Sequence, residues 1–123
     1  MGQKPINIGD GIPSPSSKHQ VVQTIFLSQS STSTGLYLFN FLDGSIEYFD
    51  KEIKQTFEYV LVDNVGPGKV RIAFNRPGLD LTVSRNGAKT LRRGDSLYIQ
   101  DSIRNLTLYF LETSLVEMIL ISK

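Results

Sequence analysis

The stretch TLRRGDSLYIQDSIRNLTLYFLETSLVEMILI, residues 90–121, decides the fold class of this chain. It holds three apolar runs, residues 97–100, 103–111 and 115–121, which are separated by turn-forming residues. Short runs of aliphatic and aromatic side chains bounded by Gly, Asp and Ser are typical of β-strands. Arg93-Gly94-Asp95 is expected to be a simple turn, because Gly tolerates a positive φ and Asp caps local amides. The closing stretch therefore predicts three strands joined by turns.

The same spacing of apolar runs and turns extends toward the N-terminus. Further strands are predicted at residues 21–27, 36–42, 45–49, 56–62, 70–75 and 79–83. Asp43-Gly44 is expected to form a two-residue hairpin, since Asp-Gly is a strong signal for that turn. Residues 50–55 are expected to be a charged connection or one helical turn. Turn signals every ~8–12 residues predict an all-β fold, a single antiparallel β-sandwich or jelly-roll-like domain over residues 20–123.

Residues 1–19 differ in composition from the rest of the chain. They are rich in Gly, Pro and Ser, and their apolar residues other than Met1 and the prolines are the isolated Ile6, Ile8 and Ile12. Such a composition cannot form a packed element by itself, so we expect a flexible N-terminal arm. The arm either frays or becomes ordered on a neighbouring subunit by inserting these three isoleucines. Extended, residues 1–19 reach ~60 Å, which is enough to cross to another subunit.

Length, charge and composition exclude several classes of partner. The chain has 123 residues, no cysteine and a formal net charge of +1. It is expected to be one domain without disulfides or cysteine-based zinc sites. The small net charge, and a basic segment without aromatic residues spaced to stack bases, argue against nucleic acid as a partner. We expect no signal peptide and no membrane partner, and a location in a virion or otherwise in the cytoplasm.

The residues needed for catalysis are scarce. His19 is the only histidine and lies in the arm, so neither a catalytic triad nor a histidine-based metal site is predicted. Glu47 and Glu58 fall where strands show their solvent side, which disfavours a glycosidase pair of carboxylates. No glycine pattern matches a nucleotide-binding loop. We therefore predict a protein that is not an enzyme and binds no cofactor or metal.

The charged residues are segregated along the chain. Residues 69–93 are strongly basic, and residues 43–63 are mainly acidic. If they lie on different faces, the basic side of one subunit meets the acidic side of its neighbour and sets its orientation. The alternative is that these charges pair within one molecule or stay hydrated. The residues assigned to this charge complementarity are Arg71, Arg85, Arg92, Arg93, Glu47 and Glu58.

The two closing runs are apolar at both alternating sets of positions. A strand on the outside of a monomeric sandwich shows one polar face. Leu106, Leu108 and Phe110, like Val116, Met118 and Leu120, are expected to face the core. Either these two strands are central and covered on both sides, or their second face binds another subunit. A small domain has little to cover a second apolar face, so we expect the second arrangement. The predicted oligomer interface consists of Tyr109, Leu111, Leu115, Ile119 and Ile121.

In this pattern the chain resembles the small β-sandwich virion proteins of tailed bacteriophages, especially head decoration proteins. The likeness is carried by the Gly/Pro/Ser arm, by Leu91-x-x-Gly94-Asp95-Ser96-Leu97 leading from a turn into a strand, and by the closing apolar strands. The resemblance implies a homo-oligomer, commonly a trimer, that sits on a capsid shell and grips neighbouring subunits with its arms. No binding residue of that family can be transferred individually, because the family has no fixed motif.

Two functions from different classes follow from these features. The first is a non-enzymatic structural protein that oligomerises and stabilises a larger assembly, such as a phage capsid. The second is a monomeric module that binds carbohydrate or another ligand, with Tyr37, Tyr48 or Tyr98 as exposed stacking platforms. The absence of tryptophan, which is usually the strongest platform, weakens the second.

Overall fold

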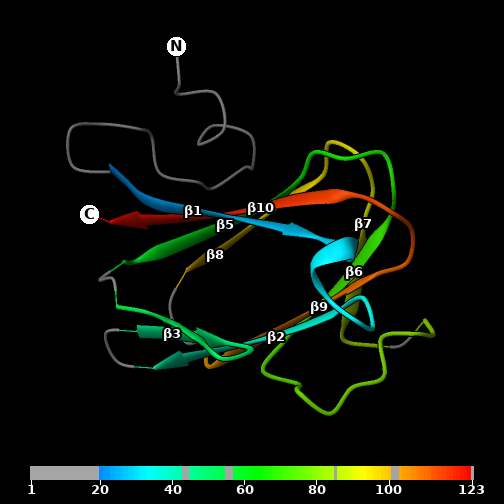
Figure 1. Cartoon of the computed structure of the whole chain (residues 1–123), viewed down its shortest axis with the longest axis horizontal. Helices are drawn as coiled ribbons and strands as arrows, with labels where there is room; N and C mark the ends of the chain where they lie inside the picture. The colour runs from blue at the N-terminus through cyan, green and yellow to red at the C-terminus, as the bar shows by residue number, and fades with distance from the viewer. Residues whose placement is uncertain (1–19, 43–44, 55–56, 85, 101–102, 123) are drawn as a thin grey trace.

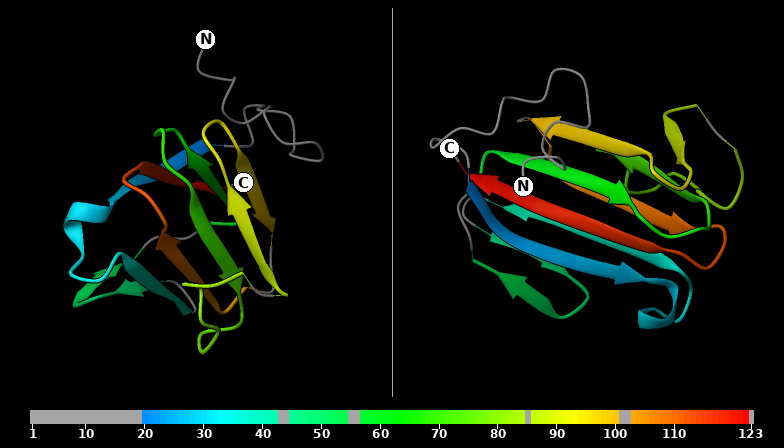
Figure 2. Two further views of the ribbon diagram at one scale, coloured as in Figure 1. Left: turned by 90° about the vertical axis from the view of Figure 1, so that its right-hand side faces the viewer. Right: turned by 90° about the horizontal axis from the view of Figure 1, so that it is seen from above.

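The computed structural model describes residues 20–42, 45–54, 57–84, 86–100 and 103–122, which form two antiparallel sheets packed face to face (Figures 1 and 2). The four-stranded sheet has the order β1 (Gln20–Ser28), β10 (Leu115–Ser122), β5 (Tyr59–Asn64), β8 (Ser96–Gln100). The six-stranded sheet has the order β4 (Lys51–Ile53), β3 (Ser45–Tyr48), β2 (Leu36–Leu42), β9 (Asn105–Phe110), β6 (Val70–Phe74), β7 (Ala88–Leu91). A single 3-10 turn, η2 (Gln29–Ser31), follows β1. The predicted all-β sandwich is confirmed.

The strand pairs are nested around β6 and β7. Outward from that hairpin, β5 pairs with β8, β2 with β9 and β1 with β10, and successive pairs alternate between the two sheets. A long antiparallel ribbon wound in this way is a jelly roll, which closes both sheets over one core. The hairpin β3–β4 extends the six-stranded sheet beyond the nested pairs.

Most predicted strands are present. Strand β1 matches the prediction for residues 21–27, and Leu42 stands opposite Ser45, so β2 and β3 pair as the predicted hairpin requires. Asp43 and Gly44 themselves lie outside the described residues. The charged connection at residues 50–55 instead contains β4, a short edge strand paired with β3.

The strand predicted at residues 79–83 is wrong. Residues 75–84 form a loop in which the Asp80 carboxylate accepts hydrogen bonds from both the backbone N–H and the hydroxyl of Thr82, at 3.0 and 2.6 Å. Asp and Thr side chains that bond local amides favour turns over strands. On the side away from β9, β6 pairs with β7, a strand of four residues that the hydrophobic pattern did not reveal.

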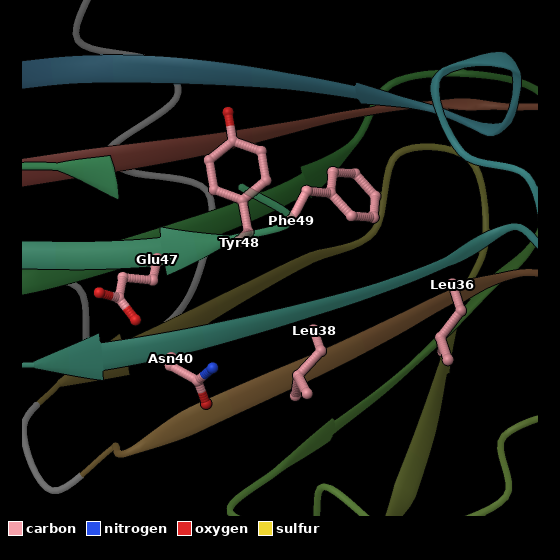
Figure 3. A pocket seen from close by; sticks show the side chains of 6 residues that line it. All are labelled: Leu36, Leu38, Asn40, Glu47, Tyr48 and Phe49. Atoms are coloured by element: carbon pink, nitrogen blue, oxygen red, sulfur yellow. The ribbon is translucent and has the colours of Figure 1, made fainter. Parts of the chain in front are cut away.

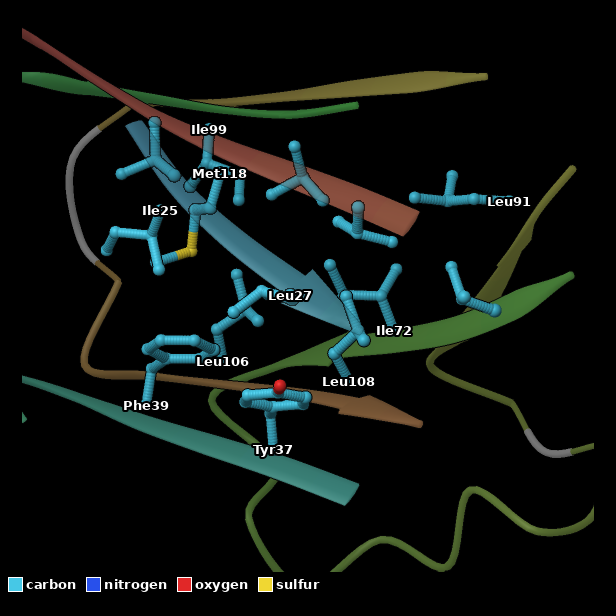
Figure 4. Packing of buried hydrophobic residues seen from close by; sticks show 14 of the residues in the cluster. Ile25, Leu27, Tyr37, Phe39, Ile72, Leu91, Ile99, Leu106, Leu108 and Met118 are labelled. Atoms are coloured by element: carbon cyan, nitrogen blue, oxygen red, sulfur yellow. The ribbon is translucent and has the colours of Figure 1, made fainter. Parts of the chain in front are cut away.

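The core lies between the sheets (Figure 4). From the six-stranded sheet it takes Leu106, Leu108 and Phe110 of β9, and from the four-stranded sheet Val116, Met118 and Leu120 of β10. These six assignments confirm the predicted core faces. Burying an aliphatic side chain of this size contributes about 1.5–3 kcal/mol, so the closing strands supply much of the driving force for folding.

The two closing strands belong to different sheets. Strand β9 lies in the middle of the six-stranded sheet and β10 in the middle of the four-stranded sheet. Their core faces therefore point toward each other across the sandwich, and their second faces point in opposite directions. The second faces of β9 and β10 therefore belong to two separate surfaces on opposite sides of the molecule.

A buried asparagine joins the loops at one end of the sandwich. Asn64 is fully buried, and its side-chain amide donates to the carbonyls of Gly68 and Leu91 at 2.8 and 2.9 Å. Its side-chain oxygen accepts from the Ser114 hydroxyl at 2.7 Å. The predicted turn at residues 93–95 is confirmed beside it, with Gly94 at φ 86° and the Asp95 carboxylate accepting from the backbone N–H of Arg92.

Candidate interaction surfaces

The outer face of the six-stranded sheet carries a row of exposed leucines on β2. Tyr37 and Phe39 point into the core, so the alternate residues Leu36, Leu38 and Leu42 point outward and are 40, 37 and 49 % exposed. The exposed Asn40 lies between Leu38 and Leu42 in this row. Several exposed large aliphatic side chains on one strand are a typical sign of an interaction site. We call this row the β2 leucine surface.

A hollow of about 250 Å³ lies at the end of this surface, where β3 stops and β2 continues. Its walls are formed by residues of β2, of β3 and of the turn after β3: Leu36, Leu38, Asn40, Glu47, Tyr48 and Phe49 (Figure 3). Phe49 has a φ of 53°, is half exposed, and lies 5.1 Å from the Tyr37 ring, centroid to centroid. A non-glycine residue at positive φ is held there by its surroundings, in this case by packing against Tyr37.

The other half of the same outer face is covered. Arg71 of β6 donates from Nη1 to the carbonyl of Leu81 at 3.0 Å, so the loop of residues 75–84 lies against this half. Thr107 and Ala73, which also point outward, are buried, and the Thr107 hydroxyl has no hydrogen-bond partner. The exposed apolar part of the face is therefore confined to β2.

The outer face of the four-stranded sheet carries a second apolar cluster. It consists of Tyr59, Leu61, Ile119 and Ile121, with the half-buried Tyr98 packed against them. Strand alternation places these side chains opposite to the core residues Val60, Val62 and Leu120. We call this group the outer cluster.

Tyr98 is the most perturbed titratable group of the described residues. Its ring stacks on Tyr59 at 5.4 Å between centroids, and its hydroxyl is covered yet has no hydrogen-bond partner. Burial, followed by the nearby Tyr59 and Glu58, raises the pKa of Tyr98 to about 12. A phenol with a raised pKa stays protonated at neutral pH and is a poor proton acceptor, so this perturbation does not indicate catalysis.

The five residues predicted to form one interface do not lie together. Tyr109 is on β9, and Leu111 follows directly after that strand, so both belong to the six-stranded side. Leu115, Ile119 and Ile121 are on β10, on the outer side of the four-stranded sheet. Of these three, Leu115 is exposed, and Ile119 and Ile121 are buried.

The sequence analysis missed the β2 leucine surface and the outer residues of β5. Residues 36–42, like the closing runs, are apolar at almost every position, and that signal was sufficient to predict a second apolar face. Tyr59 and Leu61 carry the same signal in the run at residues 56–62.

Most of the charged residues that were predicted to orient a neighbouring subunit lie on or beside the six-stranded sheet. Glu47 lies on β3, opposite Glu52 on the edge strand β4. Arg71 lies on β6 at the other side, and the exposed Arg92 and Arg93 follow β7. Glu58 is exposed beside β5 in the other sheet. Acidic and basic residues thus lie at opposite sides of the six-stranded sheet, with the β2 leucine surface between them.

Several predicted site residues lie outside the described part of the chain. These are the arm residues Ile6, Ile8 and Ile12, together with His19 and Arg85. Within the described ranges, no three His, Cys, Asp or Glu residues gather into a group that suits a metal ion. Asp63, which sequence reasoning did not single out, is buried and accepts a hydrogen bond from the Ser96 hydroxyl at 3.1 Å. In the part of the chain that is described, there is no helix long and apolar enough to cross a membrane.

The three tyrosines considered as stacking platforms have different surroundings. Tyr37 is buried, stacks on Phe39 and donates its hydroxyl to the carbonyl of Ser28 at 3.0 Å, so its expected exposure is wrong. The ring packs inward because it alternates with the exposed leucines on β2. Tyr48 is half-buried at the hollow, and Tyr98 belongs to the outer cluster.

Comparison of the chain with protein-family models, with curated proteins and with solved structures found no match.

Proposed function

We propose that this protein is a non-enzymatic structural protein that associates with copies of itself and stabilises a larger assembly. The supporting observation is the β2 leucine surface, in which Leu36, Leu38 and Leu42 of one strand point outward with Asn40 between the last two. Monomeric proteins rarely expose such a row, because each leucine gains free energy when it leaves water. A neighbouring subunit is the occupant that fits an apolar strip inside a charged margin.

The charges beside the strip orient the neighbour. Glu47 and Glu52 lie at one side of the six-stranded sheet, and Arg71, Arg92 and Arg93 lie at the other. Two copies that pack these strips face to face, with the acidic side of each on the basic side of the other, form a two-fold dimer. The trimer that the resemblance to head decoration proteins implies needs in addition a head-to-tail contact, in which the acidic edge of one subunit meets the basic edge of the next.

The larger assembly in this proposal is a phage capsid or another virion surface. Jelly rolls occur in viral capsid proteins, in lectins and in cupins, so the fold is compatible with this role without identifying it. A ligand that binds only the assembled state stabilises that state by mass action, which is how a decoration protein acts. A capsid or portal gene beside the gene for this chain supports the proposal, and a neighbourhood of sugar-degrading enzymes contradicts it.

The association is tested by sedimentation equilibrium at micromolar concentration. The unchanged chain is expected to form an oligomer, and Leu38→Glu is expected to be a folded monomer because it places a charge in the centre of the strip. The control is Val83→Glu, which changes an exposed apolar residue on the loop of residues 75–84 and should leave the oligomer intact. A monomeric unchanged chain, or an unaffected Leu38→Glu oligomer, contradicts the interface.

A second candidate function is supported by the hollow beside the same strip. The half-exposed Phe49 supplies an aromatic face on which a sugar ring can stack, whereas Asn40 and Glu47 of the same hollow point away from the two aromatic rings (Figure 3). A glycan screen with the unchanged chain and with Phe49→Ala tests it. Binding that is lost in Phe49→Ala, by a chain that sediments as a monomer, favours the carbohydrate module over the structural protein.

A further inference from the structure

The sequence contains a single asparagine that is followed by glycine, the pair Asn86-Gly87. It lies in the turn that leads directly into β7 at Ala88. Asn86 and Gly87 are both exposed, and Gly87 has a φ of 90°. A glycine carries no side chain that could shield its own backbone nitrogen. The turn therefore presents the side-chain amide of Asn86 to solvent beside an unshielded peptide nitrogen.

This pair of groups has an intramolecular reaction whose only co-reactant is water. The Gly87 nitrogen loses its proton to solvent base and attacks Cγ of Asn86, so that an N–Cγ bond forms. The Cγ–Nδ2 bond then breaks, and Nδ2 takes up a proton and leaves as ammonia. Water opens the resulting succinimide. Hydrolysis at Cγ gives aspartate, and hydrolysis at the main-chain carbonyl gives isoaspartate, in which the backbone runs through Cγ.

The guanidinium of Arg76 lies against the reacting nitrogen's own residue. A β-carbon at Gly87 would be 2.9 Å from Nε and 3.0 Å from Cζ of Arg76, so the arginine side chain fills the space beside this glycine. A positive charge at that place favours the anionic form of the Gly87 nitrogen and the oxyanion that develops at Asn86. The surroundings of the turn therefore favour the cyclisation.

The fold restrains three other asparagines. The backbone nitrogen that follows Asn40 donates to the carbonyl of Arg104 at 2.8 Å. The backbone nitrogen that follows Asn64 donates to the carbonyl of Leu115 at 3.0 Å. Asn75, at the other end of the same loop as Asn86, accepts two backbone N–H groups on its side-chain oxygen, at 2.6 and 3.2 Å. At each of these positions a hydrogen bond must break before a nitrogen can reach the side-chain carbon.

From these observations we infer that Asn86 is a site of deamidation in the folded protein, which converts through a succinimide to aspartate and isoaspartate. The site goes beyond the proposed function, because the reaction depends on the turn and on Arg76 and not on association with another subunit.

The products change the basic side of the six-stranded sheet. Each conversion puts a carboxylate beside Arg76 in place of a neutral amide, and the formal net charge of the chain falls from +1 to zero. Isoaspartate also lengthens the backbone immediately before Ala88, which stands opposite Ala73 of β6. Where the basic side orients a neighbour, a consequence that rests on the proposed function, the converted chain associates more weakly.

The site is tested by peptide mapping with mass spectrometry after the folded full chain is kept at mildly alkaline pH. Asn86 is expected to convert at least about tenfold faster than Asn64, whose following nitrogen is released only by local opening. Both aspartate and isoaspartate are expected at position 86. Conversion no faster than at Asn64 contradicts the inference. Aspartate without isoaspartate contradicts it as well, because direct hydrolysis of the amide gives aspartate alone.

Two variants show whether the reaction has the assigned origin. Asn86→Gln lengthens the side chain by one methylene and disfavours the small ring, so position 86 should stay unconverted. Arg76→Gln removes the charge beside Gly87 and should slow the conversion of Asn86, with urea unfolding as the check that the variant is folded. Conversion of Asn86 at an unchanged rate in folded Arg76→Gln overturns the role of Arg76.

The consequence for association is measured separately. Asn86→Asp carries the charge of the product and should sediment as a weaker oligomer than the unchanged chain, whereas Asn86→Gln should match the unchanged chain. Equal association of Asn86→Asp and Asn86→Gln overturns the effect on the basic side. The mass-spectrometric result at position 86 is independent of that outcome, so failure of the proposed assembly and failure of the deamidation site are distinguishable.

Discussion

At the scale of single residues, Asn64 is the buried side chain whose hydrogen-bond partners are most specific to its amide group. Its amide donates two hydrogen bonds to carbonyls and accepts one from a hydroxyl, and it has no contact with solvent. These bonds connect β5 to the loop before β6, to the end of β7 and to the turn before β10. In the sequence Asn64 only begins the turn-forming stretch NVGPG at residues 64–68, because hydrogen bonds to residues 27 and 50 positions away leave no local signal.

We predict that Asn64→Asp destabilises the domain by about 2–4 kcal/mol. The substitution replaces the amide nitrogen, which donates both hydrogen bonds, with a carboxylate oxygen that faces the carbonyls of Gly68 and Leu91, and it buries a charge without a cation. Ser114→Ala is the matched control and should cost only about 1 kcal/mol, since one neutral hydrogen bond is lost. Urea unfolding of both variants measures the difference. Equal losses would show that Asn64 is not the centre of the network.

We predict that Tyr98 makes the free energy of unfolding decrease at alkaline pH. Its pKa is raised to about 12 in the folded state from an ordinary value of 10.0, so the folded state keeps a proton that the unfolded state loses. This contribution to the free energy of unfolding is complete below pH 10 and decreases as the pH rises through 12. Urea unfolding across this range should show a smaller decrease for Tyr98→Phe than for the unchanged protein.

The same variant has a second expected result at neutral pH. The Tyr98 hydroxyl is covered and has no partner, so its removal should leave stability unchanged or increase it. Tyr37→Phe, which loses the hydrogen bond to the carbonyl of Ser28, should instead cost about 1 kcal/mol. A loss at Tyr98→Phe as large as that at Tyr37→Phe would show that the Tyr98 hydroxyl has a partner.

At the scale of elements, the connection between β5 and β6 packs against the connection between β9 and β10. Gly66 and Gly68 lie so close to residues 113–115 that a β-carbon on either would collide with backbone atoms. The local sequence Gly66-Pro67-Gly68 predicts a turn. It does not show why these two positions require glycine. The reason is the close approach of a segment about 45 residues further along the chain.

We predict that Gly68→Ala costs about 1–3 kcal/mol, because the new methyl group overlaps the carbonyl oxygen of Thr113 and the backbone must move. Gly78→Ala is the matched control, since nothing lies within 4 Å of a β-carbon at that position. It should be neutral or slightly stabilising, as the unfolded chain loses conformational freedom. Thermal unfolding of the two variants measures the contrast, and equal effects would contradict the close packing.

Residues 79–83 are an element for which the local hydrophobic pattern gave the wrong secondary structure. Residues 79–83 alternate between apolar and polar side chains as a strand does, yet Asp80 binds the amide and hydroxyl of Thr82 and turns the chain. Leu81 is buried as expected for an inward-facing position, but in a loop whose carbonyl receives Arg71. Alternation reports that a side chain is buried, and only strand pairing decides whether the backbone is extended.

At the scale of the whole molecule, the two sheets use their second faces differently. The six-stranded sheet leaves the β2 leucines exposed, and the four-stranded sheet has a covered apolar cluster at one end. In the proposed assembly the β2 leucine surface is therefore the face that contacts a neighbouring subunit, because its leucines are exposed whereas most apolar side chains on the outer face of the four-stranded sheet are not.

The sequence by itself determined the class of the fold, its principal strands and hairpin, and the core faces of the closing strands. These features follow from local sterics and from apolar side chains at every second residue, which act within a few positions of the chain. Only the tertiary structure decided that β9 and β10 lie in different sheets, which splits the predicted interface of Tyr109, Leu111, Leu115, Ile119 and Ile121 into two opposite surfaces. Sheet membership depends on pairing between segments far apart in the chain, such as β1 with β10, and alternation within one strand carries no information about its partner.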